Sequence, residues 1–508
     1  MTDHTSQPAI EARDISKTFG GVAALDGVDF ELAWGEVHAL LGENGAGKTT
    51  LCNIIAGIYR AEGGSMIVQG EAHDFKTPAQ AIEAGIGMVH QHFRLVEPMS
   101  VAENIHLGWP ETPRVVSQKV LVERTETLMA EVGLNVDPTA KIWQLSVGEQ
   151  QRVEILRVLA RGARVLILDE PTAVLTAHEA VELFAVVRQL VAGGRSVIFI
   201  SHKLNEVLEV SDRITVLRDG VHEITRETAG ATASELARLM TGESQELEIE
   251  HREVEGDPIL ELTGVSAVND RGITALHDIS LTVRAGEIFG VAGVSGNGQT
   301  ELAEVISGLR ASASGTISVD GSDLTKASVR EITDRGVGHI PEDRIGVGMV
   351  ASAPVKDNAV LRHYWTDELS SGIKLDRQGV IDYAEQMVAD ARVQTRSIDA
   401  TAGQMSGGNQ QRLVARREAM VAERVLIAAH PTRGLDVLAA QEVQTSILAR
   451  RDAGCAILFI SDDLDEVLLM SDRVAVMYEG EVMGVFAAAD ADREQIGLMM
   501  GGHQAEAS

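Results

Sequence analysis

Short apolar runs that alternate with longer amphipathic segments recur along the whole chain. The runs VHALL (37–41), VLIL (165–168) and SVIFI (196–200) have the length of buried strands. One segment of helical character, VLVERTETLMAEVGL (120–134), lies in a stretch with few strand signals. Because buried strands that alternate with helices form parallel sheets, the pattern predicts an α/β fold with an inserted helical subdomain. No run approaches the roughly 20 apolar residues of a membrane-spanning helix.

The pattern occurs twice. GEVHALLGENGAGKTTL (35–51) matches GEIFGVAGVSGNGQTEL (286–302) at an offset of 251, and VLILDEPT (165–172) matches VLIAAHPT (425–432) at an offset of 260. Because each offset holds over its own region, differences within the matches are substitutions rather than misalignments. The sequence therefore predicts two tandem domains of one mostly parallel α/β fold, 1–243 and 258–508, joined by an acidic linker at 244–257.

Composition narrows the class of protein. With 508 residues, 44% of them hydrophobic, the chain can form two well-packed domains. The formal net charge of −31 argues against nucleic acid as a partner, because phosphates would be repelled. Cys52 and Cys455 are the two cysteines, which argues against a disulfide framework or a zinc site. The first 14 residues lack the basic and apolar segments of a secretion signal, so a cytoplasmic location is expected.

The stretch GENGAGKTT (42–50) follows an apolar strand and opens a helix, the context in which a glycine-rich loop binds phosphate. Backbone N–H groups of such a loop converge on phosphate oxygens, and the helix N-terminus adds a favourable dipole. Lys48 would reach the β- and γ-phosphates of ATP, and the Thr49 hydroxyl would bind Mg²⁺. The candidate nucleotide-binding residues are Gly42, Glu43, Asn44, Gly45, Ala46, Gly47, Lys48, Thr49 and Thr50.

Two carboxylates end the apolar strand VLILDE (165–170). A buried acid is costly unless it is paired or binds a cation. Asp169 is therefore expected to hold Mg²⁺ through water, and Glu170 to act as general base on the attacking water. The alternative is a pair of solvated acids in a turn.

The segments LSVGEQQRVEILRVLA (145–160) and MSGGNQQRLVARREAM (405–420) occupy matching places in the two copies. With the loop and strand motifs in this order, the chain resembles the nucleotide-binding subunits of ATP-binding-cassette proteins over nearly all of its length. The resemblance implies that Ser406, Gly407 and Gly408 cap a helix onto the γ-phosphate held by the other copy. A Ser-Gly-Gly sequence at a helix start is also a plausible anion site in itself.

Three further roles follow from the resemblance. Gln91 would sense magnesium and couple the ATPase to a membrane subunit. His202 would contact the γ-phosphate, with a purely structural histidine as the alternative. Phe19 would stack on adenine, with a core phenylalanine as the alternative.

The second copy keeps its loop but differs at the chemical positions. Its candidate nucleotide-binding residues are Gly293, Gly296, Gly298 and Thr300. The replacements are Gln299 for the lysine, Ala429 for the magnesium aspartate, His430 for the base, Asp462 for the γ-phosphate histidine and Glu342 for the glutamine. Random drift in a domain without a ligand would also erode the glycines. We therefore expect the second loop to bind nucleotide and to hydrolyse it poorly.

Members of the family clamp two nucleotides between head-to-tail copies, so the resemblance implies intramolecular pairing of the two domains. The first loop would then meet MSGGNQ (405–410) and Asp436 of the second copy. The second loop would meet LSVGE (145–149) and Thr176, where Val147 and Thr176 depart from the family's glycine and aspartate. On this arrangement the intact parts fall in one composite site and the altered parts in the other.

Within the family the chain is most similar to the ATPase subunits of bacterial importers for nucleosides and simple sugars. The residues that carry this similarity include GMVHQHFRLVEPMSVAENI (87–105), DEPTAVLT (169–176), PEDR (341–344) and AAHPTRGLDV (428–437). It implies ATP and Mg²⁺ as cofactors, two transmembrane permease subunits, an extracellular substrate-binding lipoprotein and a peripheral place at the cytoplasmic face of the membrane.

Nucleosides are the expected cargo, with a ribose-type monosaccharide as the alternative. A soluble twin-cassette ATPase that acts on ribosomes is less favoured. Such twins usually keep both catalytic sites and carry a basic interdomain arm, whereas the linker here is acidic and one site is altered.

Overall fold

Two compact units, Met1–Glu246 and Leu247–Ser508, make up the chain. The structure is a computed structural model, and it describes residues 7–90, 93–109, 111–113, 115–172, 175, 177–201, 203–242, 249, 251–252, 255–372 and 374–502. Much of the predicted linker lies outside the described residues, and so do Gln91, Thr176 and His202.

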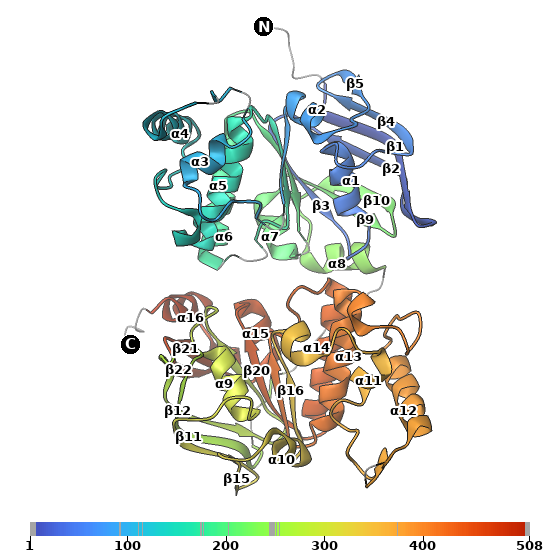
Figure 1. The fold of residues 1–508 in the computed structure, drawn as a ribbon, viewed down its shortest axis with the longest axis vertical. Coiled ribbons are helices and arrows are strands. Elements are labelled where there is room, and N and C mark those ends of the chain that lie inside the picture. The colour runs from blue at the N-terminus through green and yellow to red at the C-terminus, as the bar shows by residue number, and fades with distance from the viewer. Residues whose placement is uncertain are drawn as a thin grey trace. The chain divides into compact units, whose positions relative to one another are not determined.

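The first unit, coloured from blue to green in Figure 1, is built on a six-stranded sheet with the order β10-β9-β3-β8-β7-β6. Neighbouring strands from β6 to β9 run parallel, and β10 is antiparallel to β9. Every residue of β3, β7 and β8 is buried, as expected for strands covered on both faces. The strands are β3 Val37–Leu41, β6 Ile86–Val89, β7 Val165–Asp169, β8 Ser196–Ile200, β9 Arg213–Arg218 and β10 Val221–Glu227. The predicted mostly parallel α/β fold is confirmed.

A second, antiparallel sheet with the order β2-β1-β4-β5 belongs to the same unit, and the sequence pattern did not predict it. Its strands bury one face only, so their apolar residues alternate with polar ones and form no continuous run. One hydrophobic cluster joins this sheet, α1 Lys48–Ile55 and the larger sheet. The strands are β1 Ile10–Phe19, β2 Val22–Leu32, β4 Gly63–Val68 and β5 Glu71–His73.

Several helices of the first unit pack against the larger sheet. A predominantly helical segment between β6 and β7 contains α3, α4 and α5, and α3 packs on both of the others. The helices are α1 Lys48–Ile55, α2 Pro78–Glu83, α3 Val101–His106, α4 Gln118–Val132, α5 Val147–Ala160, α6 Ala177–Ala192, α7 Leu204–Val210 and α8 Ala233–Thr241.

The second unit repeats this architecture, with a six-stranded sheet in the order β16-β19-β20-β13-β21-β22 and a four-stranded sheet in the order β12-β11-β14-β15. The larger sheet contains β13 Ile288–Ala292, β16 Val337–Ile340, β19 Val425–Ala429, β20 Ala456–Ser461, β21 Arg473–Tyr478 and β22 Glu481–Ala487. The smaller contains β11 Pro258–Val268, β12 Thr274–Arg284, β14 Ser314–Val319 and β15 Ser322–Asp323. The helices are α9 Gln299–Ile306, α10 Val329–Asp334, α11 Val355–Ala359, α12 Arg377–Asp390, α13 Gly407–Val421, α14 Val437–Asp452, α15 Leu464–Met470 and α16 Arg493–Met500.

Two local additions explain why the offset between the copies changes. An isolated β-bridge pairs Ser100 with Lys141 in the first unit, and the equivalent bridge pairs Pro354 with Thr401 in the second. The offset is therefore 254 from Ser100 to Pro354 and 260 from Lys141 to Thr401. The first shift coincides with a π-helical turn at Arg344–Gly348. The second coincides with a small hairpin of β17 Ser370–Ser371 and β18 Lys374–Leu375 just before α12.

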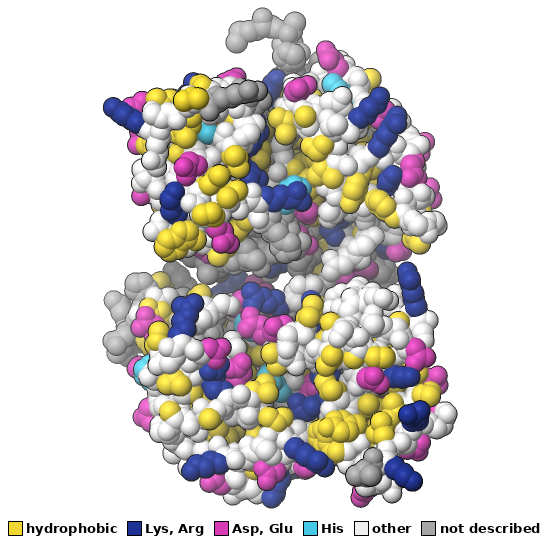
Figure 2. All heavy atoms as spheres, in the orientation of Figure 1, with side chains coloured by type: hydrophobic (Ala, Val, Ile, Leu, Met, Phe, Trp, Pro, Cys, Tyr) yellow, Lys and Arg dark blue, Asp and Glu magenta, His cyan; other side chains and the backbone are white. Residues whose placement is uncertain are grey.

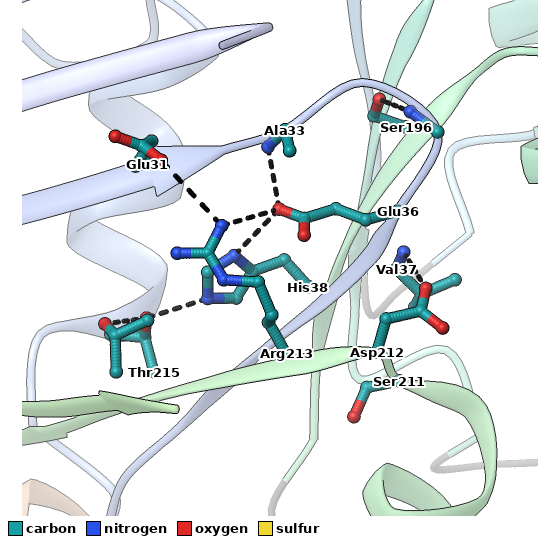
Figure 3. Close-up of polar contacts among 12 residues, drawn as sticks. Glu31, Ala33, Glu36, Val37, His38, Ser196, Ser211, Asp212, Arg213 and Thr215 are labelled. Carbon is teal, nitrogen blue, oxygen red and sulfur yellow. Dashed lines mark hydrogen bonds and ion pairs between the residues drawn. The ribbon is translucent and has the colours of Figure 1, made fainter. Parts of the chain in front are cut away.

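A polar cluster anchors the start of β3, the strand that leads into the first glycine-rich loop (Figure 3). Oε1 of Glu36 accepts the N–H of Ala33 at 2.7 Å and a bond from Arg213 at 3.3 Å. Nδ1 of the buried His38 lies 3.3 Å from the same oxygen, and its Nε2 lies 2.8 Å from Oγ1 of Thr215. Burial acts to raise the pKa of Glu36, but these hydrogen bonds and the charge of Arg213 hold it below its ordinary value.

The surface mixes both charges. On the face that Figure 2 shows, acidic and basic side chains are interspersed over the described part of each unit. Among the described residues, no helix combines the length and the apolar character needed to cross a bilayer.

Candidate active site

The first glycine-rich loop, residues 42–47, lies between β3 and α1. Gly47 caps α1 with φ 98°, a left-handed conformation that favours glycine. A Cβ at this position would lie 2.6 Å from the carbonyl oxygen of Ala24, so a larger residue would not fit. Packing against β2 therefore fixes the shape of the loop.

Lys48 extends beneath this loop. The residue is 6% exposed, and its Nζ donates to the carbonyl oxygens of Gly42 at 2.6 Å and Glu43 at 2.9 Å. Thr49 and Asn44 are exposed beside it. The ammonium group is thus held at the loop that the sequence predicts to bind phosphate.

Of the two predicted carboxylates, that of Asp169 belongs to the last residue of β7 and that of Glu170 to the residue after it. Asp169 is 7% exposed, and burial, with the nearby charge of Glu170, raises its pKa to about 6 against the opposing effect of Lys48. Glu170 has φ 46° and donates its N–H to the carbonyl of Ile200 at 3.0 Å. A solvated turn is therefore wrong for Asp169, which is buried.

This donor set fits Mg²⁺, which prefers oxygen ligands and carboxylates above all. The buried Asp169 and the partly exposed Glu170 beside it concentrate negative charge, which a divalent cation would offset. The exposed hydroxyl of Thr49 and the carboxylate of Asp169 are the described groups that could bind the ion or its water ligands.

Phe19 is on the surface, which rules out the core alternative. It is 45% exposed and lies edge-on to Tyr59, with ring centroids 5.3 Å apart. Glu62 holds the strand beside it, because its carboxylate accepts from Lys17 Nζ at 2.8 Å and from the Thr18 hydroxyl at 2.7 Å. An exposed aromatic side chain on a fixed strand can stack on a base. Tyr59 was not predicted, because only its spatial position links it to Phe19.

The helices α5 and α13, which begin in the matching segments 145–160 and 405–420, differ in charge at their N-termini. In α5, Ser146 and Glu149 form a capping box, and the N–H of Gly148 donates to Glu179 at 3.0 Å. Two carboxylates thus occupy this helix start. In α13, Ser406 is the N-cap, no acid lies in the first turn, and the guanidinium of Arg344 lies beside Gly407. The start of α13 is accordingly the better anion site.

The second glycine-rich loop keeps the shape of the first. Gly298 caps α9 with φ 101°, and a Cβ there would again lie 2.6 Å from a carbonyl oxygen, that of Ala275. Gln299 occupies the lysine position and is 2% exposed. Its amide nitrogen and oxygen are buried and have no hydrogen-bond partner among the described residues.

The second unit has a histidine where the first has the acid Glu170, and an acid where the first has His202. His430, at the place of Glu170, also has φ 46°, and its Nδ1 lies 3.3 Å from Oδ1 of Asp462, at the place of His202. Burial acts to raise the pKa of Asp462, but the contact with His430 and the charge of Arg433 lower it to about 2. Ala429 replaces Asp169 and is 3% exposed.

One pair of structural glutamates escaped the sequence prediction. Glu206 accepts hydrogen bonds from Thr172 at 2.6 Å and Ser201 at 3.1 Å, and thereby joins the segments that follow β7 and β8. In the second unit, Glu466 accepts from Thr432 and Ser461 in the same way. The two glutamates are related by the offset of 260, which was the signal that could have identified them.

Comparison with known proteins fits this duplicated geometry. The family model described as ABC transporter matches residues 25–173 and again 276–433, more than half of the chain. The chain belongs to the ABC transporter family. As a member of this family it is an ABC-type transport ATPase, and its nucleotide is ATP.

Relatives in the ABC transporter family match end to end. The glucose import ATP-binding protein TsgD13 of Haloferax volcanii is 44% identical and aligns over 99% of this chain and 98% of its own. The nucleoside import ATP-binding protein NupA of Lactococcus lactis is 42% identical over 98% and 99%. The ribose import ATP-binding protein RbsA 1 of Rubrobacter xylanophilus is 43% identical over 98% and 99%. The chain therefore has the length of a tandem-cassette import ATPase.

Proposed function

We propose that this chain energises a membrane importer through one hydrolytic nucleotide site, while a second site binds nucleotide and hydrolyses it poorly. The observation that carries the proposal is the contrast between two loops of the same shape. Gly47 and Gly298 have φ 98° and 101°, yet Lys48, Asp169 and Glu170 correspond to Gln299, Ala429 and His430.

In the hydrolytic site, Lys48 binds the β- and γ-phosphates, Thr49 and Asp169 hold Mg²⁺, and Glu170 accepts a proton from the attacking water. When bound, the ion withdraws electron density from the phosphoryl group under attack. Gln91 and His202 keep the roles expected from the resemblance, as magnesium sensor and γ-phosphate contact. Phe19, with Tyr59 at its edge, stacks on the adenine ring.

The hydrolytic site is completed by the second unit in a head-to-tail pairing. Ser406, Gly407 and Gly408 at the start of α13 are supplied to the γ-phosphate. The absence of an acid in the first turn of α13, and Arg344 beside it, support this assignment. In the proposed pairing, the start of α5 would be supplied to the altered site, where the carboxylates of Glu149 and Glu179 would hold phosphate less tightly.

The partners are two permease subunits and an extracellular substrate-binding protein, with this chain at the cytoplasmic face of the membrane. Nucleosides are the proposed cargo on the sequence resemblance and on a 42% identical nucleoside-import relative. A simple sugar is the second candidate, because the glucose-import relative is 44% identical.

ATPase rates of two variants test the asymmetry. Glu170→Gln removes the proposed general base, so we expect at least a 100-fold loss of ATP hydrolysis. His430→Ala changes the corresponding position of the second unit and is expected to leave the rate within about twofold. Loss of activity in His430→Ala, with activity kept in Glu170→Gln, would reverse the assignment of the two sites.

Uptake assays test the cargo. Cells that lack this chain are compared with cells that express it, or its Glu170→Gln variant, with radiolabelled guanosine, ribose and glucose as substrates. Restoration of guanosine uptake by the unchanged chain alone supports the nucleoside proposal. Restoration of sugar uptake instead favours the second candidate, and co-purification with ribosomes rather than permeases would contradict import altogether.

A further inference from the structure

The second unit contains a cavity of about 410 Å³ at its glycine-rich loop. Its lining contains the residues that replace Lys48, Asp169 and Glu170, together with several polar side chains. These include Gln299, Thr300, Glu342, Ala429, His430 and Arg433. The volume lies in the range of small-molecule sites.

One polar side chain that lines this cavity has no hydrogen-bond partner among the described residues. Gln299 lines it, is 2% exposed, and has neither amide atom hydrogen-bonded to a described residue. Its Nε2 lies so close to the loop that a Cβ on Gly293 would be 2.4 Å away. A buried amide without a partner is costly, so a ligand that supplies both a donor and an acceptor, directly or through water, would be favoured here.

The residues of this cavity do not fit Mg²⁺. Ala429 offers no oxygen where the first unit has a carboxylate. Glu342 has both carboxylate oxygens engaged, because Oε2 accepts the Thr300 hydroxyl at 3.2 Å and Oε1 is paired with the guanidinium of Arg433. A divalent cation bound by Thr300 and Glu342 would lie next to a full positive charge, which would repel it.

Arg433 is well placed to act as a counterion for phosphate. It follows β19 by four residues, donates its backbone N–H to the carbonyl of His430 at 3.2 Å, and keeps its side chain 41% exposed. A guanidinium offers five N–H donors, so the contact with Glu342 leaves donors available for phosphate oxygens. Asp462 lies 3.3 Å from His430. Glu304 and Asp343 also line the cavity and are engaged elsewhere. Glu304 pairs with Arg310 at 2.8 Å, and Asp343 accepts the N–H groups of Ile345 and Gly346.

We propose that the second loop binds the phosphates of a nucleotide without a divalent cation, with the Arg433 guanidinium in the electrostatic role of Mg²⁺. The ligand class is a nucleoside di- or triphosphate in its metal-free form. This inference rests on the proposed function, which requires nucleotide at the second site. It adds a reason why that site is inert: phosphate is bound there without the metal and the carboxylate base that hydrolysis needs in the first unit.

The test counts nucleotides and metal ions separately. The full chain carrying Glu170→Gln is dialysed to equilibrium with radiolabelled ATP and Mn²⁺, and protein-bound Mn²⁺ is measured by electron paramagnetic resonance. Two nucleotides and one Mn²⁺ per chain support the proposal. Two of each overturn it and leave the proposed function intact, whereas one nucleotide and one Mn²⁺ contradict nucleotide binding at the second site itself.

Variants then locate the effect. Arg433→Ala is expected to weaken the second nucleotide at least 10-fold in both EDTA and Mn²⁺, while Arg433→Lys retains part of the affinity. Arg330→Ala, which removes an exposed arginine of α10, is the matched control and should leave both nucleotides unchanged. Circular dichroism checks that each variant is folded. An unchanged second nucleotide in folded Arg433→Ala would refute the role of this residue.

Discussion

The two units hold the strand that leads into the glycine-rich loop by the same contacts. In the first unit, Asp212 accepts the N–H of Val37 at 2.8 Å and Arg213 pairs with Glu36 at 3.3 Å. The second unit repeats both contacts, Asp472 with Ile288 at 2.8 Å and Arg473 with Glu287 at 3.0 Å. These residues position a strand and touch no predicted ligand group. The two units therefore retain the same contacts that hold the strand before the loop.

The surroundings of these contacts have changed. His38 contacts Glu36, but Phe289 takes its place in the second unit, with the guanidinium of Arg473 5.0 Å from its ring centre. Burial raises the pKa of Glu287, whereas at Glu36 the added contact of His38, with the backbone N–H of Ala33 and the charge of Arg213, lowers the pKa. The comparison teaches that loop shape and loop chemistry depend on different residues, so one can be lost while the other is kept.

The largest difference in ATPase activity between equivalent substitutions in the two units is expected at the lysine position. Lys48→Ala removes a charge that contributes roughly 4 kcal/mol to phosphate binding at 4 Å and an effective dielectric near 20, before desolvation is subtracted. We expect at least a 100-fold loss of ATPase activity, whereas Gln299→Ala should change the rate less than twofold. Steady-state phosphate release measures both. Full turnover by Lys48→Ala would contradict the assignment of the hydrolytic loop.

Loop shape is tested by equal changes in both units. Gly47→Ala and Gly298→Ala each combine a left-handed backbone with a Cβ 2.6 Å from a carbonyl oxygen. We expect each to lower the free energy of unfolding by about 2–4 kcal/mol. Gly45→Ala and Gly296→Ala are the controls for the steric part of the loss, because their backbones are also left-handed, with φ 90° and 93°, but their added Cβ would have no neighbour within 4 Å. Thermal unfolding should show similar losses in the two units, and a loss confined to the first would mean that the second loop has no fixed shape.

Asp169, the proposed Mg²⁺ ligand, is also expected to lower the free energy of unfolding when its carboxylate is ionised. The pKa of Asp169 rises from 3.8 to about 6 on folding, so its ionised form opposes folding. This cost is absent below pH 3.8 and fully present above pH 6. Asp169→Asn is therefore expected to raise the free energy of unfolding of the nucleotide-free chain by roughly 1–3 kcal/mol at pH 8 and by less at pH 5.

Thermal unfolding at the two pH values measures the gain, and ATPase activity should be lost at the same time. The reverse change, Ala429→Asp, should destabilise the second unit at pH 8. A stabilisation of Asp169→Asn that did not depend on pH would assign the effect to packing rather than to charge.

The smallest effect is expected at the aromatic pair. Phe19→Ala removes a stacking surface worth about 1 kcal/mol, which corresponds to roughly a fivefold increase of KM for ATP with kcat unchanged. Stability should hardly change, because the side chain is 45% exposed. Tyr364→Ala, a half-exposed aromatic of the second unit, is the control. An unchanged KM in Phe19→Ala would exclude stacking by this residue.

Much of the fold could be predicted because its central strands leave a strong signal. VHALL, VLIL and SVIFI are buried on both faces, so they read as uninterrupted apolar runs, and the two copies confirm one another. The antiparallel sheet was missed because β1 and β2 bury one face only and contain register shifts. An alternating pattern broken by a bulge gives no regular period.

For a related reason, some residues of the site could be predicted from the sequence, whereas the contacts between distant residues could not. Lys48 and Asp169 lie within ordered motifs, and their neighbours in sequence indicate their function. The pairing of Glu342 with Arg433, and of Phe19 with Tyr59, joins segments far apart in the chain. Such pairs depend on how the chain folds back, which no local pattern encodes.

The position of β3 has a consequence for how the protein is made. This strand, complete by Leu41, lies between β8 and β9, which end at Ile200 and Arg218. A ribosome that has released only the first half of the unit has therefore produced an ATP loop with no flanking strands to hold it. Each cassette can acquire its nucleotide pocket only near the end of its own translation, so nascent chains cut short before Arg218 should be targets for proteases rather than partial enzymes.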